Sequence, residues 1–372
     1  MTTTVSPEAL DVIVVGAGQA GLAVAYHLSR QGAHFLVLDA GGEIGESWRT
    51  RWDSLRLFTS AQYDGLPGMP FPARDRDYPT KDMVADYLRD YAARFALPVR
   101  LGCAVSRVEQ VADGFVVHTG QGPLAARQVV IATGPFQTPV VPSSAADLSG
   151  EVVQLHSAEY RRPSGIPAAP VVVVGAGNSG RQIAEELTVT HDVTLAVGAK
   201  SLQLPRRFLG RDLYWWLTRT GLINKPAGSR LARRMRARGE LVVGTPLRRL
   251  RRAGVKIRPR VVSISGDEVW FENGDAVRAS TVVWATGFRA DYSWVDVPAA
   301  FDAEGHPRHE RGISAARGLA FIGLPWQHTR GSALLGFVHH DAAWVAARLH
   351  AQLAAHRSQR VPVGASGAST DV

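Results

Sequence analysis

The sequence contains a single cysteine, Cys103, among 372 residues. One thiol can form neither an intramolecular disulfide nor a CxxC redox pair, so a disulfide reductase that works through a dithiol is excluded. We predict that Cys103 is a small buried apolar side chain. His339, His340 and Asp341 are adjacent but lack the spaced partners of a metal site, so we predict no metal.

Long hydrophobic runs are also missing. No apolar stretch approaches the ~20 residues that a membrane-spanning helix needs, and the first eight residues contain no basic or apolar part of a signal peptide. We therefore expect a cytoplasmic protein without a membrane partner. A length of 372 residues allows two domains, each able to bury its own core.

Acidic residues are almost absent from one stretch. Between Lys225 and Arg260 there are 13 lysines and arginines and one acid, Glu240, a charge of +12 (13 − 1), whereas the whole chain carries +9. Such a stretch can bind nucleic acid or a membrane surface. Because it lacks the interleaved aromatics of a single-strand platform, we favour a solvated basic face that attracts an anionic dinucleotide, and we expect no nucleic acid partner.

A glycine-rich turn follows the apolar run 11–15, and a helical pattern follows the turn. In GxGxxG turns the first glycine permits a tight bend, the second lets the backbone approach a pyrophosphate, and the third lets the helix pack on the strand. The pyrophosphate rests on the free N–H groups of the new helix. The predicted binding residues here are Gly16, Gly18, Gln19, Ala20 and Gly21.

The next strand, 35–38, ends on Asp39, which lies 23 positions after Gly16. A carboxylate at this place accepts hydrogen bonds from ribose hydroxyls and repels a 2′-phosphate, so it suits FAD or NAD. We assign the first turn and Asp39 to FAD.

A second turn with the same pattern follows the valine run 171–174, and its next strand, 193–197, has no acid at its end. Basic residues follow instead, and a positive group at this place suits the 2′-phosphate of NADPH. The predicted NADPH-binding residues are Gly175, Gly177, Asn178, Ser179, Gly180, Lys200, Arg206 and Arg207.

Two further strands each end in Ala-Thr-Gly, at 132–134 and 285–287. Ligands of such sheets bind at the carboxyl ends of strands, so we expect Thr133, Gly134, Thr286 and Gly287 near a nucleotide. The sequence thus predicts an α/β fold with two dinucleotide-binding, Rossmann-like domains. The FAD domain comprises 1–169 and 285–372, with a last helix from about Ser332 to His356, and the NADPH domain, 170–284, is inserted in it.

Four segments beyond the glycine turns, 45–55, 78–88, 148–160 and 323–335, resemble the class B flavin-dependent monooxygenases. Within that group of flavin-containing monooxygenases, the sequence is most similar to the short bacterial forms and the plant auxin-forming enzymes. The family fingerprint FxGxxxHxxx(Y/F) is matched at Gly150, His156 and Tyr160, but Leu148 replaces the phenylalanine and the histidine lies two residues later.

The resemblance implies FAD and NADPH as cofactors, with dioxygen and a small organic molecule as substrates. NADPH would reduce the flavin, and a C4a-hydroperoxide of the flavin would transfer one oxygen atom. Trp48 and Arg49 would flank the flavin or its diphosphate, and the helix beginning at Ser332, with Leu334, would direct its dipole at the ring. Candidate catalytic residues are Ser60, which stands where relatives often have asparagine, and His156. A homodimer is compatible with this interpretation.

Two other hypotheses remain open at this point. The chain could be an NADPH-dependent flavoprotein reductase that passes electrons to a carrier such as ferredoxin, docked on the basic stretch. Alternatively, it could be a flavin-based redox sensor that binds nucleic acid through Arg233–Arg238.

Overall fold

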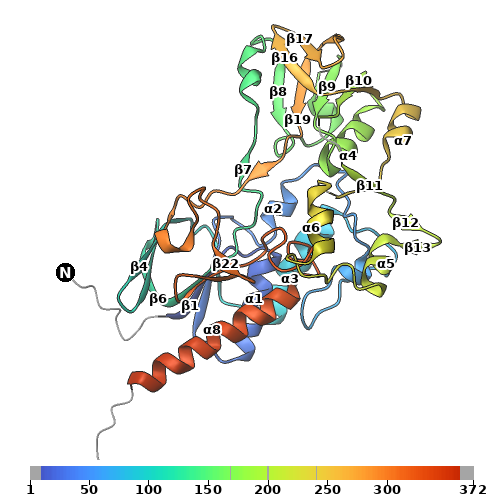
Figure 1. Cartoon of the computed structure of the whole chain (residues 1–372). Helices are drawn as coiled ribbons and strands as arrows, with labels where there is room; N and C mark the ends of the chain where they lie inside the picture. Colours follow the sequence, from blue (N-terminus) through green and yellow to red (C-terminus); the bar gives the residue numbers. More distant parts are fainter. Residues whose placement is uncertain (1–9, 168, 199–200, 240, 361–372) are drawn as a thin grey trace, which may run out of the picture.

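The computed structural model describes residues 10–167, 169–198, 201–239 and 241–360. Two lobes are visible in Figure 1, and each is built on a parallel sheet of five strands flanked by helices on one face and an antiparallel meander on the other. The predicted α/β class with two Rossmann-like units is therefore confirmed.

The first lobe contains the N-terminal glycine turn. In spatial order its parallel strands are β24 (Leu319–Phe321), β6 (Gly122–Ile131), β1 (Leu10–Val15), β2 (Phe35–Leu38) and β3 (Val99–Arg100). Because residues 12–15 of β1 are all apolar, the strand buries both faces there: Val12 and Val14 face the helices, whereas Ile13 and Val15 face the meander. The helices are α1 (Gln19–Arg30), α3 (Lys81–Arg94) and α8 (His339–Arg360), and the meander is β4 (Val105–Val111), β5 (Gly114–Thr119) and the start of β6.

The second lobe repeats this plan. Its parallel strands, in spatial order, are β8 (Val153–His156), β19 (Thr281–Trp284), β9 (Val171–Val174), β10 (Val193–Ala196) and β15 (Lys256–Arg258). Its helices are α4 (Asn178–Leu187) and α7 (Leu247–Arg252), and its meander is β16 (Val261–Ser265), β17 (Glu268–Phe271) and β18 (Ala276–Arg278). The proposed boundary at residue 170 stays a prediction, and β8 lies in this sheet although it precedes that residue.

A two-stranded antiparallel pair lies where the chain passes between the lobes (Figure 1). It consists of β7 (Thr138–Pro139), which follows the first sheet, and β20 (Phe288–Arg289), which follows the second. The two crossings are thus hydrogen-bonded to each other.

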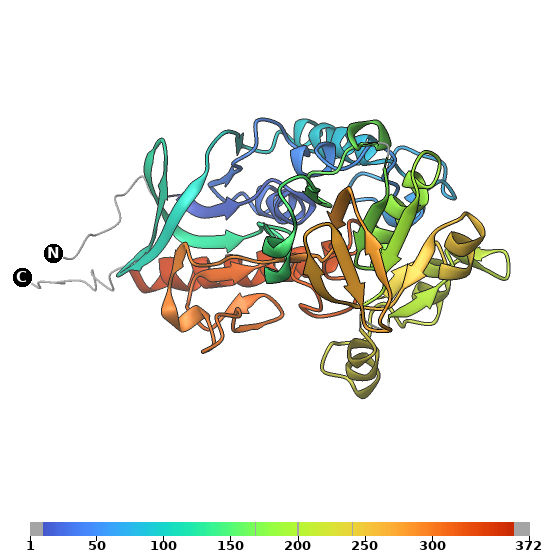
Figure 2. The same cartoon turned by 90° about the horizontal axis from the view of Figure 1, so that it is seen from above.

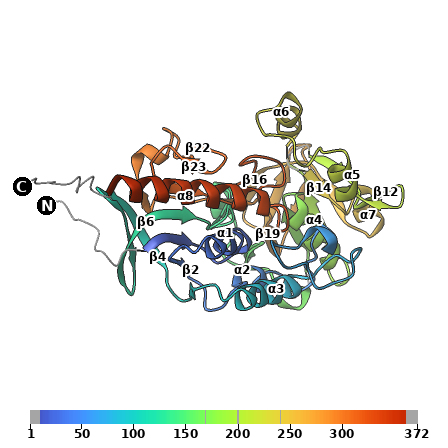
Figure 3. The same cartoon turned by 90° about the horizontal axis from the view of Figure 1, so that it is seen from below.

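A long excursion joins β10 to β15. Its elements are β11 (Leu202–Leu204), β12 (Arg207–Phe208), β13 (Arg211–Asp212), α5 (Leu213–Arg219), α6 (Arg230–Ala237) and β14 (Leu241–Val243). Helix α6 stands clear of the other ribbons in Figures 2 and 3. The remaining short elements are α2 (Glu46–Arg49), β21 (Val295–Asp296), β22 (His309–Glu310), β23 (Ile313–Ser314) and the 3-10 turns Ala61–Tyr63, Ser143–Asp147, Pro163–Gly165 and Pro298–Ala300.

The helix predicted from Ser332 begins instead at His339, so that prediction was wrong. Residues 331–338 form consecutive turns, and the Ser332 hydroxyl oxygen accepts the N–H groups of His328 and Thr329. A β-carbon at Gly336 would lie 2.0 Å from the carbonyl oxygen of Tyr63, so two backbones approach closely here. The turns bring these backbones together, and no helix dipole starts at Ser332.

Candidate functional site

The three glycines of the first turn meet different surroundings. Gly16 has a φ of +108°, and a β-carbon on it would lie 2.7 Å from the carbonyl oxygen of Ala132. A β-carbon on Gly21 would lie 1.9 Å from the carbonyl oxygen of Gly16. A β-carbon on Gly18, however, would meet no protein atom within 4 Å. Packing therefore requires the outer two glycines, whereas the middle one faces open space.

The second turn has the same three environments. Gly175 also has a φ of +108°, and its β-carbon would lie 2.3 Å from the carbonyl oxygen of Ala285. A β-carbon on Gly180 would lie 1.9 Å from the carbonyl oxygen of Gly175, and one on Gly177 would meet no protein atom within 4 Å.

Each turn leaves a helix N-terminus free for a ligand. Gly18 and Gly177 precede α1 and α4, and neither helix has a side-chain cap. The first N–H groups of such a helix need an acceptor from elsewhere and attract anions. Together with the open space at the middle glycines, these free donors fit the pyrophosphate of a dinucleotide in both lobes.

The ends of the second strands separate the two turns. The backbone N–H of Asp39 donates to the carbonyl oxygen of Arg100 (3.0 Å), and that of Val197 donates to the carbonyl oxygen of Arg258 (2.9 Å). Val197 therefore occupies in the second lobe the place of Asp39 in the first. The Asp39 carboxylate accepts the N–H groups of Ala17 (2.6 Å) and Gly41 (2.8 Å), which fixes it beside the first turn.

The predicted cations of the second site are distributed differently from expectation. Lys200 lies outside the described residues. Arg206 and Arg207 extend to the first lobe, where their guanidinium carbons lie 5.1 and 5.8 Å from the centre of the Tyr78 ring. The cation beside the end of β10 is Arg260, which donates to the carbonyl oxygen of Gly198 (3.0 Å). Sequence reasoning missed Arg260, although it belongs to the basic stretch.

Both Ala-Thr-Gly ends lie at the junction of the lobes. The Thr133 hydroxyl accepts a hydrogen bond from Gln137 (2.7 Å), and the Thr286 hydroxyl donates to the carbonyl oxygen of Val140. Gly134 and Gly287 both have positive φ, +71° and +87°. The β7–β20 pair thus joins the two predicted turns.

The two predicted flavin-side residues of α2, Trp48 and Arg49, differ in how many protein groups they already bind. The indole N–H of Trp48 donates to the side-chain oxygen of Gln19 (3.4 Å), which places Trp48 beside the first turn. Arg49 is paired with three carboxylates, those of Glu43 (3.3 Å), Asp82 (3.3 Å) and Asp86 (2.9 Å). The hydrogen bond to Asp86 is the main cause of its raised pKa. Its charge is thus already balanced by protein groups.

His156 is buried, and backbone groups occupy both of its ring nitrogens. Nδ1 accepts the N–H of Ala158 (3.1 Å), so Nε2 carries the proton and donates to the carbonyl oxygen of Gly287 (3.0 Å). Burial lowers the pKa of His156, which favours this neutral form. These contacts give His156 a role in holding β8 against the Gly287 turn.

The buried segment 59–64 contains a predicted residue and an unpredicted one. Ser60 is 1% exposed, and its hydroxyl oxygen accepts a hydrogen bond from Gln62 (3.2 Å). Asp64 is fully buried; one carboxyl oxygen accepts the hydroxyl of Thr59 (2.5 Å) and the other has no hydrogen-bond partner among the described residues. Burial raises the pKa of Asp64 to about 7. No sequence spacing marks Asp64, because its environment is formed by distant segments.

A cavity of about 520 Å³ lies beside this segment. It is lined by residues of the loop 62–70, by Thr218 and Asn224 of the excursion, and by Gly336, Phe337, His339 and His340. Trp215 and Trp216 of α5 do not line it. Trp216 instead donates to the carbonyl oxygen of Phe208 (2.9 Å) and packs on the β12–β13 hairpin.

Cys103 is 1% exposed and packs in the core of the first lobe. In the part of the chain that the structure describes, no three His, Cys, Asp or Glu side chains gather as metal ligands would. No described helix combines the length and apolarity that crossing a membrane requires.

Two glycine turns on two parallel sheets define an oxidoreductase that binds two dinucleotides. The sequence pattern of the pyridine nucleotide-disulphide oxidoreductase family matches residues 13–207. An uncharacterized CzcO-like oxidoreductase of Geobacillus kaustophilus is 43% identical over 337 residues, which cover 90% of this chain and 97% of the relative. The chain therefore belongs to the pyridine nucleotide-disulphide oxidoreductase family and is a flavin-dependent oxidoreductase.

Monooxygenases are also among its relatives, which confirms the predicted resemblance. A flavin-containing monooxygenase from Stenotrophomonas maltophilia has a similar structure, with a TM-score of 0.79, 27% identity, and coverage of 93% of this chain and 99% of that chain. The probable indole-3-pyruvate monooxygenase YUCCA3 of Arabidopsis thaliana is 26% identical over 378 residues, covering 89% of this chain and 86% of the relative.

Proposed function

We propose that this protein is an FAD-dependent, NADPH-driven monooxygenase that inserts one oxygen atom into a small organic substrate. The observation that carries the proposal is the difference between Asp39 and Val197 at equivalent places beside two matching turns. A carboxylate suits unphosphorylated ribose hydroxyls, and its absence admits a 2′-phosphate.

In this proposal the residues of the two sites act by binding and orienting. Gly18 and the start of α1 hold the FAD pyrophosphate, Asp39 holds its ribose, and Trp48 lies beside that turn. Gly177, Asn178 and Ser179 hold the NADPH pyrophosphate, while Lys200 and Arg260 attract the 2′-phosphate. When bound, the flavin accepts a hydride from NADPH and reduces dioxygen.

The electron acceptor follows from what the chain lacks. Disulphide reduction through a dithiol needs two cysteines beside the flavin, whereas this chain has one cysteine, which is buried in the core. Electrons must therefore leave to an external acceptor, and monooxygenase relatives favour dioxygen. The 520 Å³ cavity is our candidate substrate site because it combines aromatic Tyr63 and Phe337 with polar Gln62 and Asn224.

Product analysis tests this proposal. Purified protein with FAD is supplied with NADPH under isotopically heavy dioxygen and a panel of sulfides, amines and 2-oxo acids. We expect labelled product for at least one class, in proportion to the NADPH consumed beyond the background oxidation. NADPH oxidation that yields only hydrogen peroxide with every class would contradict monooxygenation.

An NADPH-dependent reductase that serves an acidic carrier is the second candidate. The protruding α6, with arginines 230, 233, 234 and 236, offers a cationic docking surface. Salt-sensitive electron transfer to ferredoxin, lost when the four arginines become glutamine, would support this candidate. Equal transfer by that variant would reject it.

A further inference from the structure

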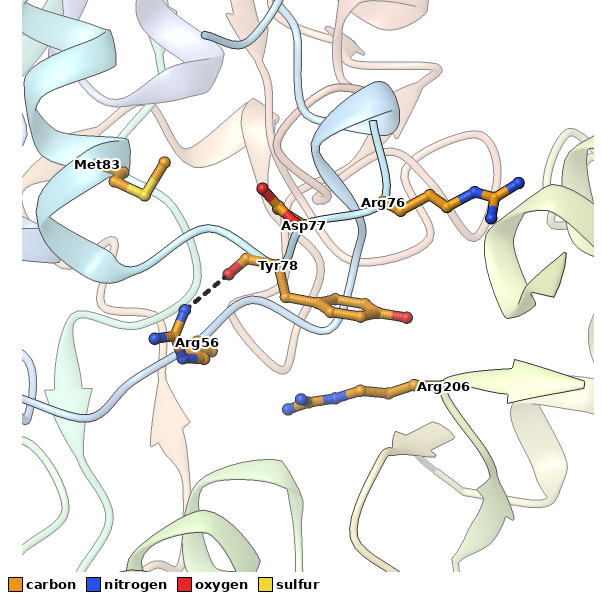
Figure 4. Close-up of a pocket in the computed structure, with 6 residues that line it drawn as sticks. All are labelled: Arg56, Arg76, Asp77, Tyr78, Met83 and Arg206. Atoms are coloured by element: carbon orange, nitrogen blue, oxygen red, sulfur yellow. Dashed lines mark hydrogen bonds between the residues drawn. The ribbon is translucent and has the colours of Figure 1, made fainter. Parts of the chain in front are cut away.

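A separate cavity of about 370 Å³ lies where the first lobe meets the excursion of the second (Figure 4). The residues that line it are Arg56, Arg76, Asp77, Tyr78, Met83 and Arg206. Three of these six side chains are cationic and one is anionic, so the lining carries an excess of positive charge. Neither glycine turn contributes a lining residue.

Arg206 is a partly desolvated cation with an unused donor. Its Nε is buried and has no hydrogen-bond partner among the described residues, and the guanidinium lies over the Tyr78 ring. Burial is the main cause that lowers the pKa of Arg206, and the charges of Arg249 and Arg56 lower it further. A buried charge without a counter-ion is costly. An anion in the cavity would offset that cost.

Arg56 approaches the same space from the first lobe. It is exposed and donates to the carbonyl oxygen of Tyr78 (3.2 Å). In Figure 4 its guanidinium lies to the left of the Tyr78 ring and that of Arg206 lies below the ring, and the two charges interact. Asp77 and Arg76 point away from these two groups in the same view. Arg56 and Arg206 are therefore the pair that can hold an anion together.

Two acidic groups near this pair that do not line the cavity already have partners. Asp212 accepts the Tyr78 hydroxyl (2.8 Å), and Glu185 binds Arg249 (2.8 Å) and the hydroxyl of Thr245 (2.6 Å). These carboxylates thus have hydrogen-bond or ion-pair partners of their own, although the charge of Glu185 also acts on Arg206. With three arginines and one acid in its lining, the cavity keeps an excess of positive charge.

The cavity is also distinct from the expected path of NADPH. Arg56 exchanges backbone–side-chain hydrogen bonds with Gln182 of α4 (3.4 and 3.5 Å), and Arg206 interacts electrostatically with Glu185 on the same helix. Glu185 lies seven residues beyond the start of α4, or about 10 Å along a helix that rises 1.5 Å per residue. A dinucleotide pyrophosphate would bind at the start of α4 instead.

We propose that this cavity binds the carboxylate or phosphate group of a small molecule other than the two dinucleotides, through Arg56 and Arg206. Such an anion would receive charge-assisted hydrogen bonds from both guanidinium groups, with the Tyr78 ring packed against Arg206. Because the two arginines come from different lobes, the bound anion would link the lobes. The inference goes beyond the proposed function, since it requires neither flavin reduction nor oxygen transfer.

The test uses the full-length, FAD-loaded protein saturated with NADP⁺, so that both dinucleotide sites are filled. Inorganic phosphate and malonate serve as separate probes, titrated at constant ionic strength against potassium chloride, and the melting temperature is measured. At least one probe is expected to raise the melting temperature in a saturable way. A response to phosphate alone assigns a phosphate ligand, and a response to malonate alone assigns a carboxylate.

Variants then locate the site. Arg206→Gln should weaken the apparent affinity for the active probe at least fivefold, and Arg56→Gln should do so independently if Arg206→Gln does not fold. Arg206→Lys should retain part of the affinity, and Arg234→Gln, on the exposed α6, is the control for loss of one charge. No saturable rise with NADP⁺ bound, or an unchanged affinity in both glutamine variants, would overturn the proposal.

Discussion

The two glycine turns have the same backbone conformation but differ in the side chains that follow the next strand. Both begin with a glycine at a φ of +108°, both place the third glycine where a β-carbon would lie 1.9 Å from the first carbonyl oxygen, and both leave the middle glycine open. The first site adds the Asp39 carboxylate, whereas the second has Val197 and the neighbouring Arg260. We therefore propose that the backbone of each turn recognises a pyrophosphate and that the side chains after the next strand select the nucleotide.

The lobes also differ in how they connect the later strands. In the first lobe β2 is followed by α2, then by α3, which packs in the core on one face of the sheet, and then by β3, the edge strand of that sheet. In the second lobe β10 is followed by the long excursion that carries Arg206 to Tyr78 and exposes α6. The repeated fold therefore provides two glycine turns, and the excursion concentrates positive charge in the second lobe.

Substitution of the third glycine in one turn at a time should have the largest effect on dinucleotide binding. Gly21→Ala places a β-carbon against the carbonyl oxygen of Gly16, so we expect protein without bound flavin. Gly180→Ala makes the equivalent change in the second lobe and should leave the protein yellow but at least tenfold slower to be reduced by NADPH. Flavin absorbance and anaerobic reduction rates measure both. Loss of flavin from Gly180→Ala would mean that the lobes do not bind independently.

A methyl group at the middle glycine of either turn should weaken dinucleotide binding in that lobe without disturbing the packing of the protein. A β-carbon at Gly18 or Gly177 meets no protein atom, so the apoprotein of Gly18→Ala or Gly177→Ala should melt as the wild type does. Each should weaken only its own dinucleotide, FAD or NADP⁺, by about tenfold, because the methyl group separates backbone donors from the pyrophosphate. Titration calorimetry measures the two affinities, and unchanged affinities would show that the ligands lie elsewhere.

Introducing an acidic side chain at the end of β10 should remove the difference in nucleotide preference between the two sites. Val197→Asp puts a carboxylate at the place that Asp39 occupies in the first lobe, and it should lower the preference for NADPH over NADH by tenfold or more through repulsion of the 2′-phosphate. Val197→Leu is the matched control and should keep the preference. Steady-state rates with both coenzymes supply the ratio, and an equal ratio in Val197→Asp would contradict the assignment.

Removing the existing acid tests the first site. Asp39→Asn loses charge-assisted acceptance of ribose hydroxyls, worth about 1.5–3 kcal/mol per hydrogen bond to a charged group, so FAD should bind ten- to about a hundredfold more weakly. NADPH affinity should not change. FAD affinity that survives intact would remove Asp39 from the site.

The lobes should also respond oppositely to pH. Burial raises the pKa of Asp64 to about 7, so the native state holds more protons than the unfolded chain between about pH 4 and 7, and stability falls as pH rises through that range. Burial lowers the pKa of His156, so its contribution is lost as pH falls below its usual value. Asp64→Asn should flatten the fall in melting temperature toward pH 7, and His156→Gln the fall on the acidic side. Unaltered profiles would show that other groups set the response.

Local patterns allowed the fold and both turns to be predicted, because a valine-rich strand, a GxGxxG turn and a helix are contiguous in sequence. The start of α8 was misplaced because the close approach of Gly336 to Tyr63, which the turns at 331–338 allow, is a tertiary contact. Arg260 and Asp64 were missed for the same reason, since distant segments create their surroundings. Arg206 and Arg207 were assigned to NADPH by proximity in sequence; their side chains contact Tyr78 of the other lobe, and their role in NADPH binding stays a prediction.

We propose that the first turn holds a flavin, which receives hydride from NADPH bound at the second turn. Anaerobic mixing of the purified protein with NADPH or NADH, followed by absorbance of the flavin, tests it most directly. We expect a yellow protein that bleaches at least tenfold faster with NADPH than with NADH. A colourless protein that does not take up added FAD, or equal bleaching by the two coenzymes, would contradict it.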